Sequence, residues 1–226
     1  MVTLVVDPTR FGGVGLEVMG DDYRHLFRSL RLRVGDRLRV VDGFGSARFS
    51  RVEAVDRRRA ELSLAGPAPA GEPARRVEVA VAAIRPERAG WAVEKVTEVG
   101  AAAIHWFGCE RAPRRYGAGQ LERFRRIATS AVSQSGRSLV PPVDTLAWRQ
   151  LLELASELDT ALLDPAAAAT LAGAGRQLVV VGPEGGLTDD ETRALTGLGA
   201  IRYKVGETTL RTETAAVVAC ALSLCQ

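Results

Sequence analysis

The sequence predicts a two-domain protein of the α/β class, in which a small β-barrel precedes an α/β domain with a largely parallel sheet. Residues 1–70 contain short apolar runs at close spacing, which is typical of a barrel. A stretch rich in proline and glycine follows at 66–73 and has the composition of a linker. After it, apolar runs alternate with helical segments, as they do in a parallel α/β sheet.

The first part is predicted to hold four strands and one helix, separated by Gly-Asp, Asp-Gly and Val-Asp-Arg-Arg turns. We therefore assign residues 1–70 to an N-terminal domain. The expected strands are 3–6, 37–41, 47–55 and 60–64, and the expected helix is 21–31.

The second part, residues 74–226, is predicted to alternate strands with helices. Each strand is an apolar run of the kind buried within a sheet, and the helices show apolar residues at helical spacing. The expected strands are 77–83, 102–107, 160–163 and 178–181, and the principal helices are 87–98 and 119–135.

Composition excludes several classes of protein. No apolar run approaches the roughly 20 residues that span a bilayer, and the N-terminus lacks the basic segment of a secretory signal. The three cysteines are odd in number and show no Cys-x-x-Cys spacing, so we expect a reduced cytoplasmic protein that makes no membrane contact. The chain has only two histidines, and we therefore predict no metal site.

Positive charge is concentrated in the first two thirds of the chain. Residues 1–70 carry 12 Lys or Arg against 9 Asp or Glu, residues 71–149 carry 13 against 8, and residues 150–226 carry 5 against 10. The segment 111–137 has seven arginines and one acid, and His25 lies in a second basic group. Arginine binds phosphate in a bidentate manner, which favours a nucleic-acid partner. A G+C-rich genome and a solvated helix face are the alternatives.

The most informative segment is the loop 182–186, Gly-Pro-Glu-Gly-Gly, which directly follows the apolar run 178–181. Thr188 and Glu191 form a predicted capping box at the start of the next helix. Small molecules bind outside the carboxyl ends of strands in α/β sheets, and glycine permits close approach to backbone. The loop matches neither the dinucleotide fingerprint nor the P-loop. We therefore predict a different kind of binding loop.

A second unusual loop, 205–216, leads into an apolar helix near the end of the sequence. Two strand–loop–helix units this close together predict one composite site. Arg211 and Glu213 lie in the second loop, where they are either a surface ion pair of little energetic value or part of that site.

These loops together resemble the RsmE family of SPOUT methyltransferases. Further agreement comes from segments distributed along essentially the whole chain, in the same order. They are His25 with Leu-Arg-Leu-Arg-Val-Gly-Asp at 30–36, Asp-Gly at 42–43, Glu-Lys-Val-Thr-Glu-Val-Gly-Ala at 94–101, Glu-Arg at 110–111, Ser-Gln-Ser-Gly-Arg at 133–137 and Pro141.

The resemblance implies a PUA-like β-barrel RNA-binding domain at 1–70 and a SPOUT domain with a trefoil knot at 74–226, acting as a homodimer. It implies methylation of uridine N3 in 16S ribosomal RNA (m3U1498) from S-adenosyl-L-methionine, on 16S rRNA or the small ribosomal subunit. The implied cofactor-binding residues are Leu162, Leu163, Gly182, Pro183, Glu184, Gly185, Gly186, Val205, Gly206, Leu210, Thr214 and Ala215. We expect RNA to contact His25, Arg28, Arg31, Arg33, Arg111, Arg123, Arg126 and Arg137.

The catalytic residues expected within this scheme are Arg211 and Glu213. A fixed arginine stabilises the anion that develops at N3 and O4, while Glu213 either takes the proton or orients Arg211. The family usually has Arg-Ile where this chain has Thr208 and Thr209. Two alternatives therefore stay open, a methyltransferase of this fold acting on a different RNA site and a non-catalytic RNA-binding homologue.

Overall fold

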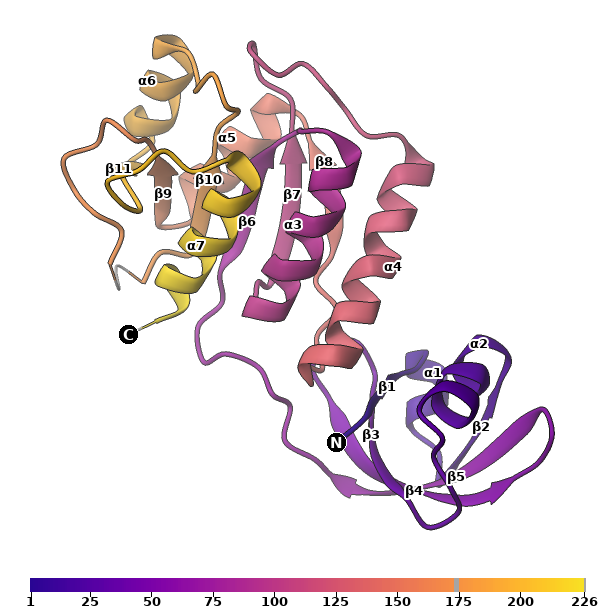
Figure 1. Ribbon diagram of the computed structural model, residues 1–226. Helices are drawn as coiled ribbons and strands as arrows, with labels where there is room; N and C mark the ends of the chain where they lie inside the picture. Colours follow the sequence, from indigo (N-terminus) through magenta and orange to yellow (C-terminus); the bar gives the residue numbers. More distant parts are fainter. Residues whose placement is uncertain (173–174, 226) are drawn as a thin grey trace. The chain divides into compact units, whose positions relative to one another are not determined.

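The computed structural model describes residues 1–172 and 175–225, which form two compact units (Figure 1). The N-terminal unit comprises Met1–Glu72 and Val132–Val140, and the C-terminal unit comprises Pro73–Ala131 and Pro141–Gln226. The chain thus leaves the N-terminal unit and returns to it once. The predicted division into two consecutive domains, 1–70 and 74–226, does not include this second segment, Val132–Val140, in the N-terminal unit.

The N-terminal unit is built on one curled sheet, a half-barrel, which agrees with the predicted fold class. The strands run in the order β1 (Thr3–Val5), β3 (Arg37–Val41), β4 (Ala47–Val55), β5 (Arg59–Pro67) and β2 (Gly15–Met19). Only β1 and β3 pair in parallel. Alternate residues of β5 are buried, so one face of the sheet carries the core. The sequence analysis missed β2 and the single-turn helix α1 (Pro8–Phe11).

The predicted helix 21–31 is irregular. It starts as α2 (Gly20–Tyr23) and continues as a π-helical turn, η1 (Arg24–Ser29). Tyr23 and Leu26 bury their side chains in the core of this unit. Arg31 adopts a left-handed backbone with φ of 59°, which ends the helix before the predicted boundary.

A buried ion pair fixes the returning segment of the N-terminal unit. The carboxylate of Glu72 accepts hydrogen bonds from Arg137 Nη2 at 2.7 Å and from the backbone N–H of Ser138 at 2.7 Å. Close packing accompanies it, because a Cβ on Gly71 would lie 2.3 Å from the carbonyl oxygen of Gly136. Arg137 is only 3% exposed, so its charge belongs to the interior of this unit.

The C-terminal unit has one parallel sheet of six strands, as the alternating pattern predicts. Strand β10 lies near its middle, between β9 and β6. The order is β11 (Ile201–Tyr203), β9 (Thr160–Leu163), β10 (Leu178–Val181), β6 (Glu78–Ala82), β7 (Ala103–Phe107) and β8 (Val143–Leu146). The trefoil knot implied by the resemblance stays a prediction.

Five helices belong wholly or mainly to this unit: α3 (Pro86–Val99), α4 (Ala118–Ser135), α5 (Trp148–Glu157), α6 (Asp189–Gly197) and α7 (Thr212–Leu224). Helix α7 contacts α3, β6 and β10, and Figure 1 shows it in front of the sheet. Residues of α5 and α6 form a core cluster with Ala80, Leu178 and Val180. Central strands covered on both sides read as continuous apolar runs, which is why the sequence located them.

Helix α7 is the predicted apolar C-terminal helix. Ala216, Ala219 and Cys220 are fully buried on its packed side. In residues 1–172 and 175–225, no helix is long and apolar enough to cross a membrane.

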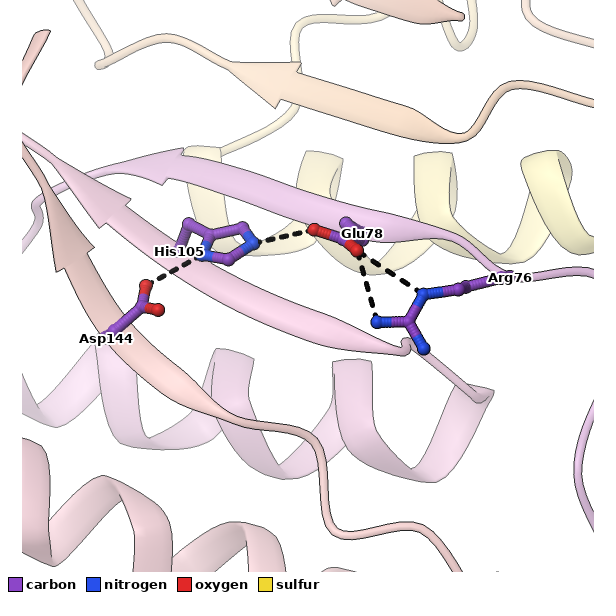
Figure 2. A network of polar contacts seen from close by, with 4 residues as sticks. All are labelled: Arg76, Glu78, His105 and Asp144. Atoms are coloured by element: carbon purple, nitrogen blue, oxygen red, sulfur yellow. Dashed lines mark hydrogen bonds and ion pairs between the residues drawn. The ribbon is translucent and has the colours of Figure 1, made fainter. Parts of the chain in front are cut away.

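A buried histidine connects three neighbouring strands of the sheet (Figure 2). His105 on β7 lies with Nδ1 2.7 Å from Oδ1 of Asp144 on β8, and with Nε2 2.9 Å from Oε2 of Glu78 on β6. Arg76 donates to the other oxygen of Glu78. Burial lowers the pKa of His105, but the hydrogen bonds and charges of Asp144 and Glu78 outweigh burial and raise it to about 9. His105 is therefore a cation at neutral pH.

Candidate active site

A cavity of about 310 Å³ lies at the carboxyl ends of β9, β10 and β11, and we call it the glycine-loop pocket. The loop after β10 forms one wall, and the loop between β11 and α7 forms another. The end of β9 supplies the rest, together with the first turn of α7. Its lining includes Leu162, Leu163, Asp164, Val181, Gly182, Pro183, Glu184, Gly185, Gly186, Leu187, Tyr203, Lys204, Val205, Gly206, Thr208, Thr209, Leu210, Thr212 and Ala215.

The conformation of loop 182–186 depends on its glycines. Gly186 has φ of 71°, a left-handed value that strains any residue with a side chain. A Cβ on Gly182 would meet Leu187 Cγ at 3.3 Å, so close packing also favours glycine there. The predicted capping box at Thr188 and Glu191 is confirmed and fixes the end of the loop. The loop therefore lines the pocket with three glycines, Pro183 and Glu184.

Every residue predicted to bind a cofactor lines this pocket except Thr214, which lies half-buried on α7. The structure thus brings together residues that are 53 positions apart in sequence, from Leu162 to Ala215. Thr212 adds a contact that the sequence analysis did not foresee, because its Oγ1 donates to the carbonyl of Gly182 at 3.3 Å. This bond joins α7 to the glycine loop.

The two expected catalytic residues lie at the start of α7 but do not contact each other. Arg211 is exposed, and its guanidinium makes no hydrogen bond or ion pair within residues 1–172 and 175–225. Glu213 is only 7% exposed, and its Oε1 lies 3.6 Å from Nε of Arg88 on α3. Arg88 also donates to Glu184 of the glycine loop at 2.7 Å. Residues two apart on a helix do not face each other, which explains why Glu213 pairs with Arg88 rather than Arg211.

Glu213 is a buried carboxylate with one unsatisfied oxygen. Within the described residues, its Oε2 has no hydrogen-bond partner. It does not line the glycine-loop pocket, whereas its neighbour Thr212 does. Glu213 instead faces Arg88 on α3.

Comparisons with known proteins agree with this architecture. Residues 71–224 match the family model described as an RNA methyltransferase domain, and residues 19–65 match an RNA methyltransferase PUA domain. The chain is 34% identical to the ribosomal RNA small subunit methyltransferase E of Mycobacterium tuberculosis, over 95% of this chain and 87% of that protein. The chain belongs to this family of RNA methyltransferases.

Solved structures of similar proteins have the same fold. The ribosomal RNA small subunit methyltransferase E from Neisseria gonorrhoeae, bound to S-adenosyl methionine, is 28% identical with a TM-score of 0.84, covering 98% of this chain and 95% of that one. A probable rRNA-methyltransferase from Porphyromonas gingivalis is 27% identical with a TM-score of 0.80, covering 97% and 95%. The half-barrel of this methyltransferase therefore corresponds to a PUA domain.

The basic residues predicted in the PUA domain are accessible. His25, Arg28, Arg31 and Arg33 are all exposed. Arg28 donates to the carbonyl of Arg57 at 3.1 Å. Their binding to RNA stays a prediction.

The arginines predicted in the methyltransferase domain fall into three kinds. Arg111 donates through Nη1 to the carbonyl of Gly185 at 2.5 Å, so it contacts the glycine loop directly. Arg123 and Arg126 are exposed on α4. Arg137 is buried against Glu72, which occupies its guanidinium, and we remove it from the RNA-binding set as a correction.

Sequence reasoning missed Arg88, which contacts both site carboxylates. A signal was available, because Arg88 follows the strand β6 by a short Ile-Arg-Pro-Glu segment. That position is at the carboxyl edge of the sheet, where ligands bind. What the sequence did not show is that β6 lies next to β10, which brings Arg88 to the glycine loop.

Proposed function

We propose that this enzyme transfers the methyl group of S-adenosyl-L-methionine to N3 of a uridine in 16S ribosomal RNA of the small ribosomal subunit. Family membership supports the methyltransferase reaction, and the Neisseria gonorrhoeae relative binds S-adenosyl methionine. One observation carries the proposal further: loops 182–186 and 205–210, the end of β9 and the start of α7 converge on one cavity. We propose that this glycine-loop pocket holds the cofactor.

The lining of the pocket suits such a cofactor. Leu162, Val181, Leu187 and Leu210 supply apolar surface for an adenine ring, and the glycine loop supplies backbone groups for polar contacts. Asp164 supplies a carboxylate to a ligand that carries positive charge. When bound, S-adenosylmethionine supplies an electrophilic methyl group on a sulfonium.

The uridine must lose its N3 proton, and the developing anion needs a nearby cation. We propose Arg211 for this role, because it is exposed at the end of the second loop, directly before α7, and no carboxylate pairs with it within the described residues. Glu213 is buried and paired with Arg88, which favours a positioning role over that of the proton acceptor. The target base is reached only when it is unpaired or flipped from its helix.

The same proposal includes the partners implied by the family. The PUA domain binds RNA through the exposed group formed by His25, Arg28, Arg31 and Arg33, and α4 contributes Arg123 and Arg126. The enzyme acts as a cytoplasmic homodimer. Sedimentation of the purified protein tests the dimer, and a monomer at enzymatically active concentrations would contradict it.

Mass spectrometry of 16S rRNA from a deletion strain tests the reaction. We expect N3-methyluridine to be absent from that strain and restored by the wild-type gene. Unchanged N3-methyluridine in the deletion strain would remove the proposed target. If the wild-type gene instead restores a methyl group at another RNA position, the enzyme acts on a different RNA site, which is the alternative suggested by Thr208 and Thr209.

Calorimetric titration with S-adenosylmethionine separates an enzyme from a non-catalytic RNA-binding homologue. We expect binding to the wild-type protein without RNA, because the pocket is already formed in one chain. Absence of binding would favour the non-catalytic alternative.

Arg211→Ala tests the proposed catalytic cation. Loss of one electrostatic stabiliser of a transition state lowers kcat by about 100-fold. We expect that loss with little change in cofactor affinity, since Arg211 does not line the pocket. Arg193→Ala, on the exposed surface of α6, is the matched control. An unchanged kcat for Arg211→Ala would exclude the role.

A further inference from the structure

A second cavity, of about 620 Å³, adjoins the glycine-loop pocket, and we call it the arginine cavity. Pro183, Glu184 and Gly185 line both cavities, so the glycine loop is their common wall. Sheet order explains the arrangement. Strand β10 lies between β9 and β6, so its loop faces the loop of β9 on one side and those of β6 and β7 on the other.

Four arginines line the arginine cavity, from two segments that are separate in sequence. Arg85 and Arg88 follow β6, and Arg111 and Arg114 follow β7. Among the lining residues that the structure describes, Glu184 is the only carboxylate. Even with Glu213 behind Arg88, the cationic groups outnumber the anionic ones. The cavity is therefore suited to an anion.

Two of the four arginines have polar partners within the protein, and the other two have no ion-pair partner among the described residues. Arg88 is held by Glu184 and Glu213, and Arg111 is held by the carbonyl of Gly185. Arg85 and Arg114 are exposed and have no ion-pair partner within residues 1–172 and 175–225. The two paired guanidinium groups keep the cavity positively charged. The two unpaired ones can bind a ligand without first breaking an ion pair.

The base of the cavity is rigid next to Arg85. The hydroxyl of Tyr116 donates to the carbonyl of Ile84 at 2.7 Å and accepts from the Ile84 N–H at 3.1 Å. Tyr116 is buried, and its ring packs edge-on against Trp106 and Phe124. Arg85 thus extends from a fixed backbone position.

We propose that the arginine cavity binds phosphodiester groups of the RNA strand beside the target nucleotide, with Arg85 and Arg114 as the binding residues. This inference rests on the proposed function and assigns the position of its RNA substrate. Arginine guanidinium matches phosphate geometry in a bidentate manner. Because the two cavities share the glycine loop as a wall, a strand anchored in the arginine cavity places its nucleotide next to the glycine-loop pocket.

The test measures binding of a fluorescein-labelled oligouridylate to the full-length protein over a series of salt concentrations. The double variant Arg85→Gln/Arg114→Gln removes both available charges. Each lost phosphate contact reduces the slope of log K against log salt concentration by about 0.7 for single strands, so we expect a reduction of about 1.4. The double variant Arg149→Gln/Arg193→Gln removes two exposed arginines outside the cavity and is the matched control.

We expect the control to keep the wild-type slope, and calorimetry to show unchanged affinity of the cavity variant for S-adenosylmethionine. An equal slope for the cavity variant and wild type would overturn the inference, even where cofactor binding and methylation are intact. Failure of the wild-type protein to bind cofactor would instead remove the proposed function. A change of oligomeric state in the cavity variant, seen by sedimentation, would show that a second protein chain occupies this face and would also overturn the inference.

Discussion

The two neighbouring cavities of the methyltransferase domain are built by different chemical means. The glycine-loop pocket is lined mainly by apolar, glycine and threonine residues, and its loop depends on backbone conformation. The arginine cavity is lined by four guanidinium groups. They share Pro183, Glu184 and Gly185 as a wall, so one segment of chain borders both cavities. Under our proposal, the glycine-loop pocket therefore selects its cofactor by shape and the arginine cavity selects RNA by charge.

Arg111→Ala should have the largest effect on activity, because Arg111 lines the arginine cavity and holds a residue that lines both cavities. It donates to the carbonyl of Gly185, which lines both cavities, and to the carbonyl of Leu187, which lines the glycine-loop pocket. Hydrogen bonds from charged groups contribute about 1.5–3 kcal/mol each, so we expect kcat/KM to fall by about 100-fold or more.

Steady-state kinetics with small subunits from the deletion strain measures this loss. Arg115→Ala changes an exposed arginine in the same loop that lines neither cavity, and should stay close to wild type. Similar activities for the two variants would show that the shared wall does not need Arg111.

Gly186→Ala should affect mainly the glycine-loop pocket, because Gly186 lines that pocket and does not line the arginine cavity. A side chain at φ of 71° costs about 1–2 kcal/mol, which corresponds to about 5- to 30-fold weaker cofactor binding when the loop shifts to relieve the strain. Calorimetry measures the affinity. Gly197→Ala is the control, since a Cβ there meets nothing within 4 Å and its φ is not left-handed. Equal affinities for the two variants would show that loop conformation does not determine cofactor binding.

The smallest effect on activity is expected from the substitution His105→Asn, because His105 lines neither cavity. Its effect should appear in stability instead. Its pKa is about 9 in the folded protein against 6.5 for the free side chain, so protonation stabilises the fold fully below about pH 6.5, and that contribution is lost as pH rises through 9. The difference between these two pKa values corresponds to at most about 3 kcal/mol in the free energy of unfolding.

Urea unfolding at pH 6.5 and at pH 9.5 measures this contribution. His105→Asn should lose most of the stability difference between the two pH values, whereas His25→Asn, at an exposed site in the other unit, should retain it. A wild-type pH dependence in His105→Asn would show that the network of Glu78, His105 and Asp144 does not stabilise the sheet as a charged group.

The sequence located the glycine-loop pocket because its signal is contiguous. Loop 182–186 directly follows an apolar strand, and Thr188 with Glu191 marks the next helix. The central strands were also predicted well, since burial on both faces makes them uniformly apolar. Strand β8 at the edge of the sheet was missed because only Val143 at its start is buried.

The arginine cavity was not predicted because it depends on contacts between distant segments. Arg85 and Arg114 meet only because β6 and β7 are adjacent parallel strands. For Arg137 the prediction was wrong in the opposite direction. Its basic motif suggested RNA binding, but in the structure its charge is buried against Glu72. Sequence reports the type of a side chain, but tertiary pairing decides whether its charge is available to a ligand.

The most direct test of the central claim is one set of Michaelis constants, for S-adenosylmethionine and for small subunits, in Gly186→Ala and in Arg85→Gln/Arg114→Gln. We expect opposite effects: Gly186→Ala raises the KM for the cofactor by about tenfold and leaves the KM for RNA unchanged, whereas the arginine variant raises the KM for RNA and leaves that for the cofactor unchanged. Equal changes in both constants for both variants would contradict the division between a shaped cofactor pocket and a charged RNA cavity.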